Sequence, residues 1–244
     1  MKKLLLSAAT LAVMATGALA QDVVRLGTEG AYPPYNYINE SNELVGFEID
    51  LGNALCERAG LTCEWVQNDW DSIIPNLVGG NYDAIMAGMN ATPARAEVIM
   101  FSQPYKLPDP SAYMALAGTE GSVMEEGVIA AQSNTMQAAM VSDTSATLIE
   151  FPTADETIAA VRNGTADAVL ADRDFLRTYV DESNGELEFL ATVPSPGAGV
   201  SIGLRQSDSE LQATFDAAIT AMKEDGSLNA LLVEWFGDEI PLFE

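Results

Sequence analysis

The chain has 244 residues, of which 48% are hydrophobic, so it can bury a core as one large domain or as two lobes of about 100 residues each. Its 36 acidic and 11 basic residues give a net charge of −25, which repels phosphate backbones and argues against a nucleic-acid-binding protein. The absence of histidine excludes Ser-His-Asp and Cys-His catalysis and removes the commonest zinc ligand, so we expect no metal site.

The first 20 residues have the pattern of a secretory signal peptide. Lys2 and Lys3 give a positive start, residues 4–18 form an uncharged apolar run, and Ala18-Leu19-Ala20 fits a small-residue cleavage site. The apolar run is too short for a membrane span, and a buried core helix would not explain the charged start or the small-residue end. We therefore expect residues 1–20 to be removed from an exported protein.

Strands and helices alternate along residues 23–110. The patterns predict strands at 23–28, 44–47, 63–66 and 83–89, and helices at 48–59 and 70–78. Gly60 fits a helix C-cap, and Thr92-Pro93 fits an N-cap followed by proline at the first helical position. This alternation is typical of βαβ units with a largely parallel sheet.

The pattern restarts after Pro108-Asp109-Pro110. Strands are predicted at 111–117, 128–131, 166–171 and 200–204, and helices at 135–140, 154–163, 174–180, 207–225 and 228–236. Two proline-containing segments, at 108–111 and 194–199, divide the chain into a first part, an insertion and a return. We therefore expect 21–110 and 198–244 to form lobe 1 and 111–197 to form lobe 2, with a hinged cleft between them.

Two features bear on cofactors and redox chemistry. Gly197-Ala198-Gly199 lacks dinucleotide-loop spacing and precedes a strand, so no nucleotide cofactor is expected. Cys56 and Cys63 are the only cysteines, and in an oxidising compartment they indicate a local disulfide. Two buried thiols are the alternative.

Two charged residues near strand ends are candidates for ligand contact. Arg95 lies at the start of a helix after a strand, and its planar guanidinium suits a carboxylate. Asp172 ends an apolar strand, where it could hold an ammonium group. The alternatives are a surface ion pair for Arg95 and a helix N-cap for Asp172.

Three aromatic residues, Tyr32, Tyr35 and Trp70, also follow predicted strands. A cation or an apolar chain could lie on their rings. The alternative is that they pack in the core.

Segments in both lobes together carry a family pattern. They include GTEGAYPPY at 27–35, LVGFEIDL at 44–51 and NGTADAVLAD at 163–172, with further matches at 70–77, 82–89, 95, 101–105, 203–205, 225–227 and 235–236. Over nearly the whole mature chain, this pattern resembles the periplasmic amino-acid-binding proteins of ABC importers, in the branch that binds lysine, arginine, ornithine, histidine and opines. The resemblance implies an α/β, two-lobed type II periplasmic-binding fold, each lobe a mainly parallel sheet flanked by helices, with two hinge crossings.

The resemblance also implies a ligand site. Arg95 would clamp the α-carboxylate, helped by backbone amides near Thr135. Asp172 would take the α-amino group, together with the Gly88 carbonyl and Asn90.

For the ligand side chain, the resemblance implies that Tyr32 and Trp70 sandwich it and that Glu29 reaches its distal end. Cys56 and Cys63 sit where this branch carries its disulfide.

The function that the resemblance implies is binding, not catalysis. A monomeric periplasmic protein would close on a polar, basic L-amino acid or an opine and deliver it to a membrane permease, without a cofactor. We rank arginine first, then lysine or ornithine, then histidine or an opine, then glutamine. The alternative is a periplasmic dehydratase of the prephenate or arogenate type on the same fold, but acids at positions 29 and 172 argue against an anionic ring substrate.

Overall fold

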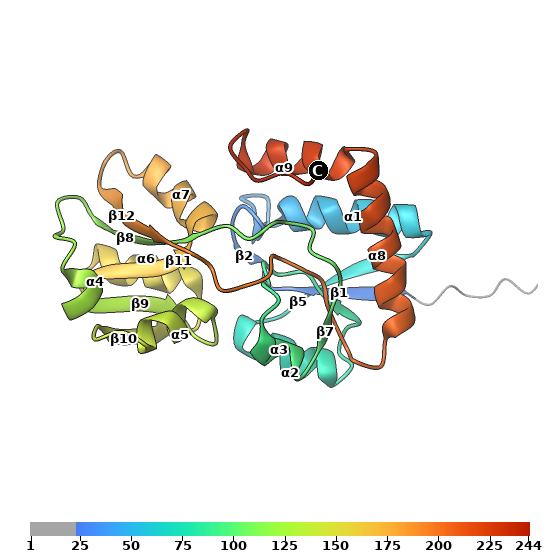
Figure 1. The fold of residues 1–244 in the computed structure, drawn as a ribbon, viewed down its shortest axis with the longest axis horizontal. Coiled ribbons are helices and arrows are strands. Elements are labelled where there is room, and N and C mark those ends of the chain that lie inside the picture. The colour runs from blue at the N-terminus through green and yellow to red at the C-terminus, as the bar shows by residue number, and fades with distance from the viewer. Residues whose placement is uncertain (1–22) are drawn as a thin grey trace, which may run out of the picture.

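The structure is a computed structural model that describes residues 23–244, so the proposed signal peptide at 1–20 lies outside the described residues. It has two lobes side by side, each built on one five-stranded sheet, and the chain crosses between them twice (Figure 1). This confirms the predicted α/β, two-lobed fold class.

Lobe 1 holds the sheet β5-β1-β6-β13-β7, in which β5, β1 and β6 are parallel and the other two pairings are antiparallel. Its strands are β1 (Val24–Thr28), β5 (Cys63–Gln67), β6 (Ala84–Ile85), β7 (Met100–Phe101) and β13 (Gly203–Leu204). Its helices are α1 (Phe47–Ala59), α2 (Trp70–Val78), α3 (Pro93–Ala96), α8 (Ser209–Glu224) and α9 (Ser227–Phe236). Because β13 follows the whole of lobe 2 in sequence, the chain returns to complete the first sheet.

Lobe 2 repeats this arrangement with the order β10-β9-β11-β8-β12. Its strands are β8 (Ser111–Leu116), β9 (Val128–Gln132), β10 (Thr147–Phe151), β11 (Ala168–Asp172) and β12 (Leu187–Val193). Its helices are α4 (Val123–Glu126), α5 (Met136–Ser142), α6 (Ala154–Arg162) and α7 (Arg173–Glu182). The parallel strands β10, β9 and β11 bring the carboxyl ends of β9 and β11 to the same edge of the sheet.

A small antiparallel sheet was not foreseen from the sequence. It contains β2 (Ala31–Tyr32), β3 (Asn36–Ile38) and β4 (Leu44–Val45). The predicted turn at 32–35 connects β2 to β3 and contains a cis Pro33–Pro34 bond. The turn places Tyr32 beside the cleft.

Two predicted strands are shorter than expected. The strand expected at 83–89 is regular only at β6, because the chain turns at Gly88, which has a left-handed φ of 61°. The strand expected at 200–204 is regular only at β13, since Val200 instead forms isolated bridges with Asn90 and Lys106. Both irregular stretches lead into the region between the lobes.

The two crossings include the residues that flank the predicted segments, Lys106 in the first and Val200 in the second, and they run side by side. Val200 of the second crossing donates its N–H to the Lys106 carbonyl of the first at 3.0 Å, and the Tyr105 N–H donates to the Val200 carbonyl at 2.9 Å. The paired segments pass between the two sheets in Figure 1. A two-stranded connection of this kind permits hinge motion between lobes.

The Cys56–Cys63 disulfide is present and joins α1 to β5 across 6.2 Å between the two Cα atoms. The prediction of a local bridge is therefore confirmed, and the alternative of two thiols is wrong. Closing so short a loop contributes about 2.5 kcal/mol in the chain-entropy model. Across residues 23–244 we find no helix long and apolar enough to cross a membrane.

Candidate functional site

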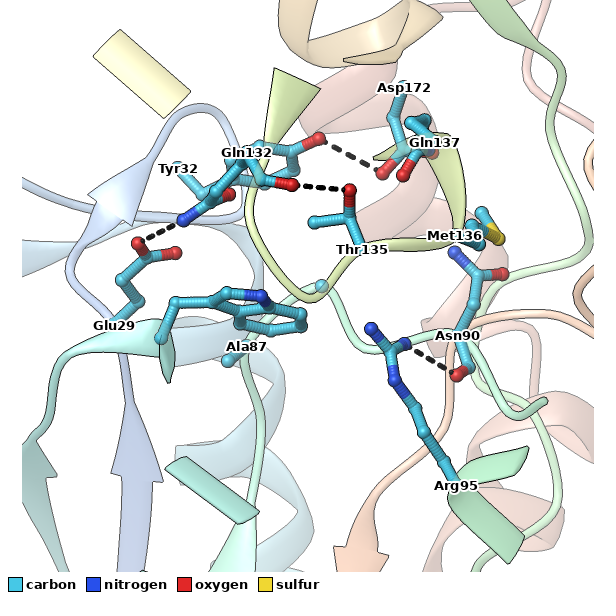
Figure 2. Close-up of a pocket in the computed structure, with 12 residues that line it drawn as sticks. Glu29, Tyr32, Ala87, Asn90, Arg95, Gln132, Thr135, Met136, Gln137 and Asp172 are labelled. Atoms are coloured by element: carbon cyan, nitrogen blue, oxygen red, sulfur yellow. Dashed lines mark hydrogen bonds between the residues drawn. The ribbon is translucent and has the colours of Figure 1, made fainter. Parts of the chain in front are cut away.

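A pocket lies between the two lobes and contains about 330 Å³ of space free of protein atoms, its opening to solvent included. All eight residues expected at the ligand site line it, together with four that were not expected; the twelve are Glu29, Tyr32, Trp70, Ala87, Gly88, Asn90, Arg95, Gln132, Thr135, Met136, Gln137 and Asp172. Figure 2 shows side chains from both lobes converging on this space.

Arg95 is placed by the short helix α3. Thr92 caps the helix by accepting a hydrogen bond from the Arg95 N–H at 3.3 Å, as the sequence predicted. The Arg95 guanidinium donates to the carbonyls of Asn90 at 3.0 Å and Asn134 at 3.2 Å, and it lies 5.1 Å from the centre of the Trp70 ring. Carbonyls and a ring face hold this group in position without neutralising it.

No carboxylate of the described chain forms an ion pair with Arg95. The Arg95 side chain is half-buried, and the surrounding protein atoms remove much of the water around its guanidinium. This desolvation lowers the pKa of Arg95 to about 10. The alternative of a surface ion pair is therefore wrong. A guanidinium that lacks an anionic partner in a cleft is suited to an incoming carboxylate.

Asp172 ends β11, where the edge of the sheet faces the pocket. It accepts hydrogen bonds from the Tyr32 hydroxyl at 3.0 Å and from Gln137 Nε2 at 2.8 Å. Asp172 occupies the N-cap position of α7, but its side chain makes no capping bond. Burial raises the pKa of Asp172, although the hydrogen bond from Tyr32 opposes the shift.

Glu29 follows β1 and is 6% exposed. Its Oε1 accepts a hydrogen bond from Gln132 Nε2 at 2.7 Å, which links lobe 1 to lobe 2 (Figure 2). Burial raises the pKa of Glu29 to about 7, because only a neutral amide compensates the desolvated carboxylate. This carboxylate would become fully ionised near neutral pH if a cation reached it.

The three aromatic candidates have different surroundings. Tyr32 lines the pocket and stacks on Phe175 of α7, with ring centres 4.4 Å apart and planes at 5°. Trp70 begins α2 and donates from Nε1 to the Ser133 carbonyl at 3.0 Å, across the cleft. Tyr35 does not line the pocket; it is 2% exposed and packs edge-on against Phe236, so for this residue the alternative of core packing holds.

Gly88 adopts a left-handed conformation that favours glycine. A Cβ at this position would lie 3.3 Å from the Tyr32 ring, which leaves little room for a side chain. The Gly88 N–H donates to both oxygens of Glu48, at 2.7 and 2.9 Å. Glu48 is fully buried and also accepts from Asn36 and Tyr105, so it fixes the backbone at the pocket wall.

Thr135 is the N-cap of α5. Its hydroxyl accepts from the Ala138 N–H at 3.1 Å and donates to the Gln132 carbonyl at 2.7 Å. Asn90 is 6% exposed and lies opposite, in the chain that leads to α3. Thr135 and Asn90 therefore belong to opposite walls of the pocket (Figure 2).

The sequence did not point to Gln132 or Gln137, although each orients a pocket carboxylate. Gln132 is the last residue of β9, so a polar residue at the end of an apolar strand was the available signal. Gln137 had no such signal, because it lies inside α5 and its reach to Asp172 depends on how α5 packs.

The pocket has an unbalanced charge. Arg95 contributes one positive charge, whereas Glu29 and Asp172 contribute two negative charges when ionised. Neither carboxylate forms an ion pair with a basic residue of the part described. In the same part of the chain, no three His, Cys, Asp or Glu residues are grouped as metal ligands. The site therefore offers one place for an anion and two for cations.

The fold and the pocket define a two-lobed α/β protein that binds a small molecule in an interlobe cleft. The chain belongs to the bacterial extracellular solute-binding proteins, family 3, whose sequence profile matches residues 24–238. The family resemblance noted in the sequence is thereby confirmed.

Similar proteins include binding proteins for arginine and octopine. The chain is 31% identical to the L-arginine-binding protein of Pseudomonas aeruginosa, covering 98% of each chain. It is 30% identical to the octopine-binding periplasmic protein of Rhizobium meliloti, covering 96% of this chain and 97% of that one. One similar solved structure is a periplasmic His/Glu/Gln/Arg/opine family-binding protein from Silicibacter pomeroyi in complex with lysine. It is 58% identical, with a TM-score of 0.86, and the match covers 90% of this chain and 100% of that chain.

Proposed function

We propose that this chain is a periplasmic binding protein that closes on a basic L-amino acid and delivers it to the permease of an ABC importer. The observation that carries the proposal is the charge pattern of the pocket, where one guanidinium and two carboxylates have no ion-pair partner among the described residues. A basic amino acid has one carboxylate and two cationic groups, so it complements all three side chains. The similar arginine-, octopine- and lysine-binding proteins support this substrate class.

In the proposed complex, Arg95 binds the α-carboxylate and Asp172 binds the α-ammonium group. The Gly88 carbonyl and Asn90 complete the ammonium site, and backbone amides near Thr135 assist Arg95. These charge-assisted hydrogen bonds contribute more than neutral ones because the cleft excludes water.

The ligand side chain would lie between Tyr32 and Trp70, and its distal cation would meet Glu29. Gln132 holds Glu29 from the opposite lobe, so the carboxylate is in place only when the lobes are together. Binding energy would then favour the closed arrangement, as differential affinity for one state requires.

The proposed lobes are 21–110 with 198–244, and 111–197. Several hydrogen bonds link them at the cleft, including Trp70 to Ser133 at 3.0 Å and Ser133 to Asp71 at 2.6 Å. We propose that the protein acts as a monomer without a cofactor, and that export through the signal peptide places it in the periplasm.

One of the similar solved structures bears on the alternative of a dehydratase. An ancestral amino acid-binding protein, described as a precursor of cyclohexadienyl dehydratase, is 26% identical with a TM-score of 0.79. We propose binding without catalysis, because Glu29 and Asp172 would repel an anionic ring substrate. Turnover of prephenate or arogenate by the purified mature protein would favour the enzyme instead.

A thermal-shift screen of the mature protein tests the proposed ligand class. A ligand that binds only the native state stabilises it by about 2.7 kcal/mol at a hundredfold excess over Kd. We expect arginine to raise Tm most, then lysine or ornithine, then histidine or an opine, then glutamine. Shifts produced only by acidic or aliphatic amino acids would contradict the proposal.

The affinity for arginine should rise with pH between about 5.5 and 7.5. Glu29 has a pKa of about 7 without ligand, so a bound proton must leave before the carboxylate meets the ligand cation. Below this pKa, one released proton changes the affinity by at most about tenfold per pH unit, and above it the dependence levels off. Calorimetry at several pH values measures how the affinity for arginine changes with pH. In Glu29→Gln, the change in affinity centred near pH 7 should disappear. An unchanged slope in the variant would assign the proton to another group.

A further inference from the structure

A buried lysine near the hinge has partners in both lobes. Lys106 is 1% exposed, and its Nζ lies 2.9 Å from Asp174 Oδ2 and 3.9 Å from Asp109 Oδ2. The ammonium group also lies 5.0 Å from the centre of the Phe236 ring and 5.7 Å from that of Tyr35. None of these five residues lines the ligand pocket.

The chain positions of these groups make the cluster a connection between lobes. Lys106 and Asp109 lie on the first crossing, and the Lys106 backbone pairs with Val200 of the second. Asp174 belongs to the first turn of α7 in lobe 2, and Phe236 ends α9 in lobe 1. The Lys106–Asp174 pair therefore attaches α7 to the hinge and to lobe 1.

Separating the Lys106 ammonium group from the carboxylates of Asp109 and Asp174 would cost free energy, so this cluster favours the arrangement in which the three groups are together. Asp174 is 6% exposed, and burial together with the nearby Asp174 carboxylate raises the pKa of Asp109, whereas the Lys106 ammonium group opposes this shift. Without Lys106, the two carboxylates would lie buried beside each other with no cation, which strongly disfavours the contact. In a protein without Lys106, opening of the cleft would expose the Asp174 carboxylate to water and so relieve this cost.

The same turn of α7 also carries the pocket contacts of lobe 2. Asp172 immediately precedes the helix and accepts from Tyr32, and Phe175 stacks on the Tyr32 ring. Attachment of α7 at Asp174 therefore determines where Asp172 lies relative to lobe 1.

We propose that Lys106, with Asp109 and Asp174, forms a hinge-side latch that stabilises the closed cleft and positions Asp172. Lys106 is a positioning residue and does not contact the ligand. The latch rests on the proposed function only in that closure accompanies binding. It acts on all ligands alike, since every amino acid requires the same closed state, and apparent Kd varies inversely with the closed fraction.

The test replaces Lys106 with Met, which keeps the length of the side chain and removes the charge. Lys223→Met is the matched control, because Lys223 is partly buried, donates to Gln103 and Pro104 at 2.8 Å each, and lies 3.9 Å from the Phe243 ring centre, all outside lobe 2. Spin labels at Glu97→Cys and Asp143→Cys, exposed positions on opposite lobes, report the interlobe distance with the native disulfide intact.

In ligand-free protein, Lys106→Met should shift the distance distribution toward longer separations, and Lys223→Met should not. Lys106→Met should also weaken arginine, lysine and glutamine binding by the same factor, about tenfold. Native distances in Lys106→Met would overturn the latch, as would equal shifts in both variants. The distance measurement needs no ligand, so it decides the latch even if no amino acid binds. If Lys106→Met does not fold, Asp174→Asn is measured in the same way and should show the same opening; native distances in that variant would likewise overturn the proposal.

Discussion

Replacing Arg95 with alanine should remove detectable binding of every amino acid, whatever its side chain. All candidate ligands share the α-carboxylate, and Arg95 is the cation of the pocket lining. Removing one partner of a hydrogen-bonded charge pair in a cleft costs about 2–5 kcal/mol. The variant should fold normally, because within residues 23–244 the Arg95 side chain contacts the carbonyls of Asn90 and Asn134 and the Trp70 ring, and it forms no ion pair there. Isothermal titration calorimetry with arginine, lysine and glutamine measures the loss.

Two further variants make this result specific. Arg162→Ala removes an arginine from an exposed ion pair with Glu186 in lobe 2, so it should leave all affinities unchanged. Arg95→Lys keeps the charge but loses the planar fork, so its affinity should lie between those of the wild type and Arg95→Ala. Near-native affinity in Arg95→Ala would remove Arg95 from the site.

The sequence predicted the parallel strands β1, β5, β9 and β11 and the main helices closely. The helix expected at 70–78 is observed as α2 with the same limits, and Gly60 caps α1 in the left-handed conformation. These elements have strong periodic patterns and clear capping residues. Edge strands β10 and β12 were missed, because exposed residues such as Glu150 and Glu188 interrupt their apolar patterns.

The eight expected pocket residues lie together because the carboxyl ends of parallel strands meet at one edge of each sheet. The position of a residue at the end of a predicted strand does not reveal side chains that support the pocket through contacts with distant parts of the chain. Glu48 reads as an ordinary acidic residue in the first turn of α1, yet it is fully buried beneath Gly88. Lys106 follows an aromatic residue in a loop, and only the packing of α7 shows that its ammonium group is enclosed.

Replacing Glu29 with glutamine should weaken arginine and lysine binding much more than glutamine binding. Glu29 is 6% exposed, and in the described chain its hydrogen-bond partner is the neutral amide of Gln132. A distal ligand cation would convert this costly buried carboxylate into a charge-assisted hydrogen bond, which typically contributes about 1.5–3 kcal/mol. The substitution keeps the size of the side chain and can keep the contact with Gln132, so it removes the charge alone.

The ratio of arginine to glutamine affinity separates a role in ligand recognition from a role in supporting the loop. If Glu29 contacts the ligand cation, Glu29→Gln lowers this ratio, because a neutral amide ligand loses no ion pair at that end of the pocket. Glu64→Gln, an exposed substitution on the adjacent strand β5, should leave the ratio unchanged. Kd values for both ligands on the three proteins, at one salt concentration and at pH 8, where Glu29 is largely ionised, give the comparison. An equal loss for arginine and glutamine would mean that Glu29 holds the β1 loop and does not contact the ligand, since a displaced loop would disturb the Tyr32 ring that every ligand side chain would contact.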